Sequence, residues 1–191
     1  MANRYNRGMT NQPFLQLTTV RRSVRRYQPL PVPRQILERC LEAARLAPSA
    51  MNAQPCSYIV VDDPALRDAI ARFTFNSVVS FNRWTLSAPA FLVMLNRSSS
   101  LAKVGATLQG RSWQQVDTGL AAAHFCLQAA EEGLGTCILG WFNERGIKGL
   151  LGIQRDYRVA LLVTVGYSAE ETSVKERKPL SAILRYNRES L

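Results

Sequence analysis

The stretch YRVALLVTVGY, residues 157–167, decides the fold class of this chain. It is rich in leucine and valine, carries no charge after Arg158, and shows no alternation between apolar and polar residues. A continuous apolar run of this length predicts a strand with both faces buried. We therefore expect it to lie within a sheet that helices cover.

Outward from this strand, shorter apolar runs alternate with helical patterns. SYIVVDD at 57–63 and APAFLVML at 88–95 predict two further strands, and GTCILGWF at 135–142 predicts a short strand or turn. Helical spacing of apolar residues predicts helices over 34–47, 65–73, 113–132 and 144–152. The residues that favour helix ends beside them are Asp63, Pro64, Gly133 and Asn143. The pattern indicates an α+β or α/β fold with few strands and many helices.

The bulk composition narrows the class of protein. The chain has 191 residues and is 47% hydrophobic, which suits one globular domain. No apolar run could span a bilayer, and residues 1–14 lack the apolar core of a secretory signal, so we expect a cytoplasmic protein. Four cysteines without metal-ligand spacing predict free, mostly buried thiols and no metal site. His124 is the only histidine, which makes a Ser-His-Asp hydrolase a poor hypothesis.

The charge is strongly basic, at +10, and is concentrated in two short segments. RRSVRR occupies residues 21–26 and KERK occupies residues 175–178. Like charges packed so closely repel one another, which suggests that they hold an anion. The two segments could converge on one compact anion, or they could be unrelated solvated patches. Composition alone favours the unrelated patches over convergence.

Two loops offer further groups that could contact a ligand. PSAMNAQP at 48–55 contains Asn52 and Gln54, whose amides suit a heterocycle with alternating donor and acceptor edges. An ordinary Asx or proline turn explains the same residues. GLGTCILG at 133–140 follows a helix and is not GxGxxG, so a dinucleotide-binding turn is not expected. Its glycines allow a flat ligand close to the main chain, although for Gly133 alone a helix C-cap with a tight turn is the better interpretation.

The predicted helix over 113–132 is apolar on almost every side. A helix of this kind has to be buried on every side. A chain of this size has little material to surround it, so we hypothesise that a second subunit covers part of it.

In their order along the chain, these motifs resemble the nitroreductase-like family of FMN-dependent oxidoreductases. The resemblance rests on RRSVRRY, ILERCLEAARLAPSAMNAQP, GLGTCILGWF and VGY followed by KERKPLSAIL, and runs from about Thr19 to Leu184. It implies an α+β fold with a central mixed, mostly antiparallel sheet of about four or five strands flanked by helices. It also implies one domain over residues 1–191, with a polar N-terminal arm over 1–18 and a substrate lid over 96–112. The expected assembly is a homodimer with FMN at the subunit interface.

The resemblance assigns roles to particular residues. The family's first and last FMN segments match Arg21, Arg22, Ser23, Arg25, Lys175 and Arg177. Most of these cations would hold the FMN phosphate, while Arg25 would reach the N1/O2 edge of the flavin ring and stabilise its reduced form. The residues expected to pack on the flavin from the second subunit are Pro48, Ser49, Ala50, Asn52 and, as a weaker candidate, Gln54. The backbone expected beside flavin N5 belongs to Ile138, Leu139 and Gly140.

The implied reaction passes hydride from NAD(P)H through flavin N5 to an electron-poor acceptor such as a nitroaromatic or a quinone. We assign no catalytic side chain, because the flavin carries the chemistry. Two departures are notable: Cys56 stands where relatives often have Trp, and Leu139 where some have Glu. A specialised flavin enzyme of the same fold (a dehalogenase, an azoline dehydrogenase or a flavin-fragmenting enzyme) is the alternative. A basic nucleic-acid-associated protein, or a flavin-binding protein without catalysis, ranks behind both, so we expect neither a nucleic-acid nor a membrane partner.

Overall fold

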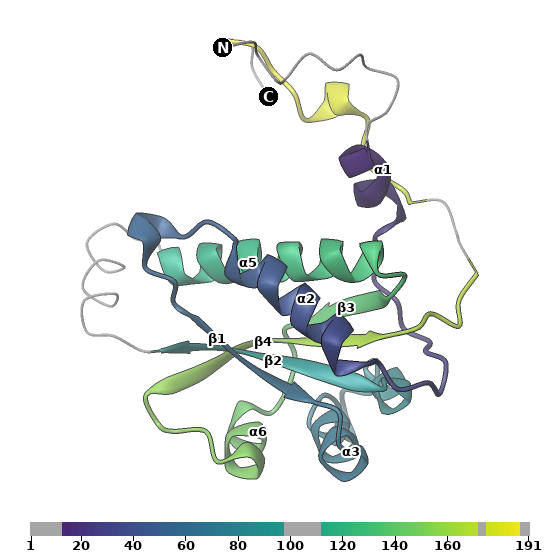
Figure 1. Cartoon of the computed structure of the whole chain (residues 1–191), viewed down its shortest axis with the longest axis vertical. Coiled ribbons are helices and arrows are strands. Elements are labelled where there is room, and N and C mark those ends of the chain that lie inside the picture. The colour runs from purple at the N-terminus through teal and green to yellow at the C-terminus, as the bar shows by residue number, and fades with distance from the viewer. Residues whose placement is uncertain (1–12, 98–111, 172–174, 188–191) are drawn as a thin grey trace.

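A four-stranded sheet in the order β1-β2-β4-β3 forms the centre of the molecule (Figure 1). The computed structural model describes residues 13–97, 112–171 and 175–187. The strands are β1 (Cys56–Val61), β2 (Ala90–Arg97), β3 (Gly135–Leu139) and β4 (Tyr157–Gly166). All neighbouring strands pair antiparallel, and a single parallel bridge joins Ser23 to Thr136. The predicted α+β class and mostly antiparallel sheet are therefore confirmed.

Strand β4 is buried on both faces, as its sequence predicts. Leu162 and Val163, neighbours on opposite faces, are both fully buried. Val163 packs in the core beneath helices α2 (Arg34–Arg45) and α5 (Trp113–Glu131), whereas Leu162 packs in the core on the other face. The second core lies beneath α3 (Pro64–Arg72), η2 (Arg83–Ser87) and α6 (Glu144–Leu151), so helices cover both faces of the sheet (Figure 1).

Local capping signals set the helix ends. The Asp63 carboxylate accepts a hydrogen bond from Leu66 N at 2.9 Å at the start of α3. The Asn143 side chain accepts one from Gly146 N at 3.0 Å at the start of α6. Gly133 has φ +74° just beyond the end of α5, a conformation that favours glycine. These caps agree with the sequence predictions, although α2 ends at Arg45, two residues before the predicted end.

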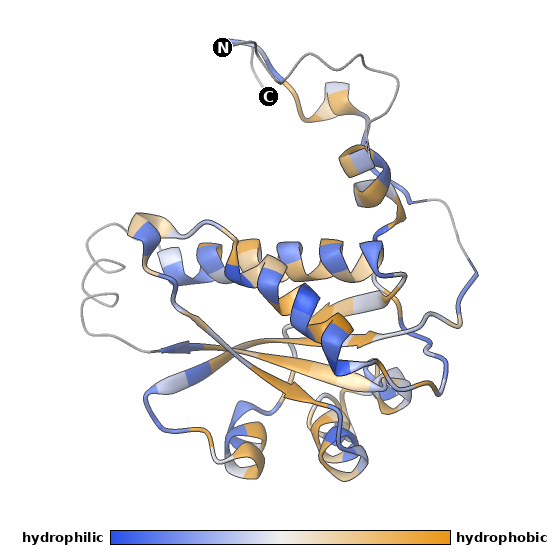
Figure 2. Ribbon diagram, viewed as in Figure 1, coloured by the Kyte–Doolittle hydropathy of each residue, from blue (hydrophilic) through white to orange (hydrophobic). Residues whose placement is uncertain are grey.

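The two ends of the described chain project from the same side of the body (Figure 1). Helix α1 (Pro13–Val20) forms the first, and the segment 175–187 with η3 (Leu180–Ala182) forms the second. Residues 13–18 of the predicted polar arm belong to α1, which carries apolar as well as polar residues (Figure 2), and Phe14 is 65% exposed. Residues 1–12 lie outside the described part of the chain.

The predicted lid over 96–112 also needs correction at its edges. Asn96 and Arg97 are the last residues of β2, where Asn96 pairs with Cys56 and with Arg158. Ser112 is the N-cap of α5. Residues 98–111, which make up the rest of the predicted lid, lie outside the described residues. Across the ranges that are described, no helix is both long and apolar enough to cross a membrane.

The four cysteines are free thiols, as predicted. Cys40, Cys126 and Cys137 are buried, and Cys56 is half-buried. Burial raises the pKa of the Cys40 thiol to about 12, so this thiol stays protonated and unreactive at neutral pH.

Candidate functional site

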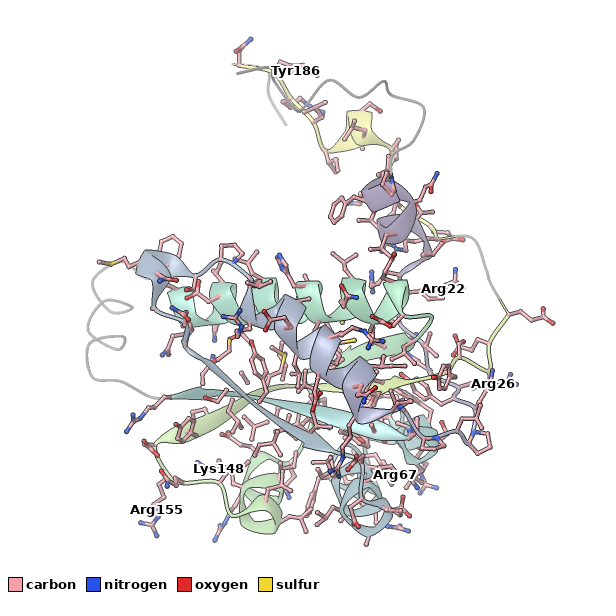
Figure 3. The ribbon with its side chains drawn as sticks, viewed as in Figure 1. Arg22, Arg26, Arg67, Lys148, Arg155 and Tyr186 are labelled. Atoms are coloured by element: carbon pink, nitrogen blue, oxygen red, sulfur yellow. The ribbon has the colours of Figure 1, made fainter. Side chains whose placement is uncertain are left out.

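The two basic segments meet within one chain. The Lys175 ammonium donates a hydrogen bond of 2.6 Å to the carbonyl of Thr18, at the end of α1. The pKa of Lys175 is lowered, mainly by partial burial and then by the positive charges of Arg21, Arg177 and Arg22. These four cations, the basic cluster, therefore lie close together although they come from opposite ends of the sequence. Figure 3 shows Arg22 at the junction of α1 with the C-terminal end of α5. The two segments are therefore close enough in space for convergence on one anion.

The segment that carries these arginines is fixed to the edge strand β3. Val24 N donates to the Thr136 carbonyl at 2.9 Å. The Tyr27 hydroxyl lies 2.9 Å from the Val24 carbonyl and 2.7 Å from the Thr164 hydroxyl, and burial raises its pKa well above the usual value. A Cβ at Gly135 would lie 2.5 Å from the Val24 side chain, so only glycine allows this close approach. These contacts hold the backbone of residues 21–27 in a defined position beside β3.

Arg25 lies further along β3 than Arg21. Burial raises the pKa of the Cys137 thiol, and the charge of Arg25, then a hydrogen bond with Ser23, oppose that rise. The pKa of Cys126 is likewise raised by burial, with Thr136 and then Arg21 opposing. The backbone N–H of Arg25 donates to the Glu170 carboxylate at 2.6 Å. Arg25 and Ser23 are both exposed.

The end of β3 is open on its outer side. β3 is an edge strand, and Ile138 is 43% exposed whereas Leu139 is 5% exposed. Among the described residues, nothing lies within 4 Å of the position that a Cβ on Gly140 would take. A flat ligand therefore has room beside Ile138 and Gly140, whereas Leu139 between them is buried.

An aromatic pocket of about 290 Å³ begins directly after Gly140. Its lining residues are Arg72, Phe73, Phe75, Asn76, Trp141, Phe142 and Asn143. The ring of Phe81 lies 6.5 Å from the ring of Trp141, and the Arg83 guanidinium lies over Phe75. The lining contains one cation and no carboxylate, so the pocket suits an aromatic or anionic group.

The loop of residues 48–54 lies apart from this edge of the sheet, at the N-terminal end of α5 (Figure 1). Its Ala50 N–H donates to the Asp117 carboxylate of α5 at 3.0 Å. Asp117 and Cys126 are nine positions apart, which is about 14 Å along the helix and on opposite sides of it. Burial raises the pKa of Cys126 and the charge of Arg21 opposes that rise, so the basic cluster lies nearer the C-terminal end of α5, whereas the loop binds near its N-terminal end.

The structure thus divides the predicted site residues into two groups. The group that meets near β3 contains Arg21, Arg22, Ser23, Arg25, Ile138, Leu139, Gly140, Lys175 and Arg177. The group that lies apart contains Pro48, Ser49, Ala50, Asn52 and Gln54, clustered on the η1 loop (Ala50–Asn52) and its flanks. One chain alone does not assemble all of them around one ligand.

Sequence reasoning missed three residues that position these groups: Tyr27, Gly135 and Asp117. Two of them carried a signal in the sequence. Tyr27 ends the RRSVRRY motif, and Asp117 is the only acidic residue among the first 18 residues of α5. The side chain of His124 shares a 2.8 Å hydrogen bond with the Leu120 carbonyl of its own helix. Within the described ranges, no three metal-binding side chains come together.

Comparison with known proteins identifies the family. The sequence model of the Nitroreductase family matches residues 18–167. This chain belongs to the Nitroreductase family. The NADH dehydrogenase of Thermus thermophilus is 28% identical to this nitroreductase-family chain, and the match covers 86% of the chain and 91% of that protein. An iodotyrosine deiodinase of Thermotoga neapolitana is 25% identical over 90% of this chain and 96% of that protein.

Solved structures confirm the fold. An FMN-dependent nitroreductase from Clostridium difficile R20291 superimposes with a TM-score of 0.74 at 24% identity. The superposition covers 91% of this chain and 99% of that protein. The nitroreductase-like fold that the sequence motifs predicted is therefore present.

Proposed function

We propose that this chain is an FMN-dependent NAD(P)H oxidoreductase that works as a homodimer. The observation that carries the proposal is the basic cluster of Arg21, Arg22, Lys175 and Arg177, which adjoins the segment that pairs with β3 at Ser23. Membership of the Nitroreductase family supports it.

The basic cluster has the chemistry to hold the FMN phosphate. Partial burial, and then the charges of Arg21, Arg177 and Arg22, lower the pKa of Lys175, and a dianionic phosphate among these cations would relieve their repulsion. Guanidinium groups bind phosphate oxygens in pairs. Lys175 has three N–H donors and, among the described residues, uses one on Thr18, which leaves two for an anion.

The edge of β3 has the shape to receive the flavin ring. The backbone of Ile138 to Gly140, in which Ile138 and Gly140 are exposed, would lie along the ring and donate toward N5. Arg25, beside Cys137, would stabilise negative charge at the N1/O2 edge. When bound, FMN supplies the hydride chemistry between NAD(P)H and the acceptor. The protein binds and orients both partners and excludes water from the ring face.

A second subunit would complete the site. Val116 on α5 is 50% exposed, and Trp113 and Leu120 on the same side of the helix are also exposed. Apolar residues on a helix surface of this kind mark a surface that another protein covers. A two-fold related copy covering α5 would bring its own 48–54 loop toward the flavin. This arrangement accounts for the separation of the two residue groups within one chain.

The aromatic pocket after Gly140 is where we expect the acceptor to bind. Its Trp141 and Phe75 rings suit an electron-poor aromatic or quinone acceptor. Arg72 makes no ion pair with any described residue and would favour acceptors that carry negative charge. The deiodinase relative makes reductive dehalogenation the second candidate reaction. A screen that follows reoxidation of the reduced flavin with nitroaromatics, quinones and halogenated phenols separates the two.

The absorption spectrum of purified protein tests the proposed function. We expect a flavin spectrum with one FMN per chain, bleaching by NADH or NADPH, and recovery when an acceptor is added. Colourless protein that ignores added FMN would refute the proposal. A cytoplasmic location and the absence of nucleic-acid and membrane partners stay predictions.

A further inference from the structure

We propose that Asp117 is a positioning residue for FMN: its buried carboxylate holds the 48–54 loop in the strained shape that presents Ser49 and Asn52 to the flavin. The inference rests on the proposed function, in which this loop packs on the flavin of the second subunit. Asp117 belongs to α5 and is not itself expected to touch the cofactor.

The loop adopts a backbone conformation that its sequence disfavours. Met51, Asn52 and Gln54 have φ values of 51°, 55° and 46°, in the left-handed region. Asparagine tolerates this region, but methionine and glutamine do not. Three such residues within four positions, none of them glycine, persist only when the surroundings impose the shape. Met51 is fully exposed, so burial of its own side chain does not supply that constraint.

Hydrogen bonds inside the loop close its turn but do not attach it to the fold. Gln54 N donates to the Ser49 hydroxyl at 3.0 Å, and Asn52 N donates to the Ser49 carbonyl at 3.0 Å. The Gln54 side chain donates to the Asn52 carbonyl at 3.2 Å. These contacts would move with the loop as a unit.

The bond from Ala50 N to Asp117 attaches the loop to the fold. It joins η1 to α5 at 3.0 Å, and Asp117 is only 4% exposed. In the portion of the chain that is described, Asp117 forms no ion pair, so the backbone N–H of Ala50 is a principal partner for a buried charge. A hydrogen bond to a buried carboxylate is stronger than one between neutral groups, and an unpaired buried carboxylate is costly.

Packing beneath the 48–54 loop is incomplete, so the loop depends more on the bond from Ala50 N to Asp117. A pocket of about 150 Å³ lies between the loop, α2 and β1. Its lining includes Ser49, Cys56, Tyr58 and Asp117 itself. Cys56, a small residue, stands at the start of β1 beside this space. The loop is therefore held from one side by Asp117 and faces solvent on the other.

Two variants with the same branching of side-chain heavy atoms test the inference. Asp117→Asn keeps an oxygen that accepts from Ala50 N, whereas Asp117→Leu is larger and has no acceptor. We expect Asp117→Leu to raise the Kd for FMN about 10- to 100-fold and to change the visible circular dichroism of bound flavin. Asp117→Asn should stay within about threefold of the wild type. Thr118→Val is the matched control, because Thr118 is equally buried but bonds to Asn96 and Gln114 rather than to the loop.

The outcomes separate a positioning role from a structural one. If Asp117→Leu and Thr118→Val lose similar thermal stability but only Asp117→Leu loses FMN affinity, the inference is supported. Equal FMN affinity and flavin dichroism in wild type and Asp117→Leu overturn it. If Asp117→Leu does not fold, amide hydrogen exchange in wild type decides: a protected Ala50 N–H supports the inference, and an unprotected one overturns it. Wild-type protein that binds no FMN would instead refute the proposed function. The hydrogen-exchange measurement would still test the bond between Ala50 N and Asp117.

Discussion

Replacing Lys175 with methionine is predicted to weaken binding of FMN while leaving binding of riboflavin, which has no phosphate, unchanged. Within the described ranges, Lys175 uses one N–H on the Thr18 carbonyl and has two left for an anion. A hydrogen bond to a charged group contributes about 1.5–3 kcal/mol, and each 1.4 kcal/mol is about a tenfold change in Kd. We therefore expect the Kd for FMN to rise about 10- to 150-fold, measured by quenching of flavin fluorescence at fixed ionic strength.

Lys178→Met provides the control for this change. Lys178 lies on the same segment and is exposed, and it does not contribute to the lowered pKa of Lys175. The control should bind FMN as the wild type does. Equal losses of FMN and riboflavin affinity in Lys175→Met would show that the variant damages the fold rather than the phosphate site. An unchanged Kd for FMN would refute the assignment of the basic cluster to the phosphate.

Three further predictions follow from other contacts. Tyr27→Phe removes the bonds to the Val24 carbonyl and to Thr164 and should lower the free energy of unfolding in urea by about 1–3 kcal/mol, whereas an unchanged value would contradict the anchoring role. Hydrogen bonds from Arg39 hold the pKa of Glu132 at about 2, below its usual 4.5, so the stability from this pair is present above about pH 4.5 and is lost as pH falls toward 2. Arg39→Met should therefore flatten the acid limb of a stability-versus-pH profile, and an unchanged limb would count against the pair. Met51→Gly removes the strain at φ 51° and should raise the free energy of unfolding by up to about 1 kcal/mol, so a decrease would argue against strain in the loop.

The fold was largely predictable because its signals are local. The unbroken apolar run of β4 predicts burial on both faces, and Asp63 and Asn143 accept the capping hydrogen bonds that their positions suggest. Helix α1 within the predicted arm over 1–18 was not predicted, because charged and polar residues precede the helix that Pro13 begins. The sequence also could not predict which side of α5 is buried against the sheet, because a helix that is apolar on almost every side does not distinguish its faces.

The site was predictable in its residue types but not in its arrangement. Both basic segments were evident, yet only the packing of α1 against the C-terminal segment brings Lys175 to Arg21. Gly135, a candidate for close approach by a ligand, instead makes room for Val24. The left-handed residues of the 48–54 loop include no glycine, so sequence carried no sign of the strain or of its partner Asp117.

The central claim is that the two basic segments hold one FMN phosphate at an interface between two copies of this chain. A crystal structure of the FMN-bound protein tests it most directly. The account predicts phosphate oxygens about 3 Å from the side chains of Arg21 and Lys175, with the flavin ring along residues 138–140 and the 48–54 loop of a second subunit against it. A phosphate bound elsewhere, or a flavin enclosed by one chain alone, would contradict it.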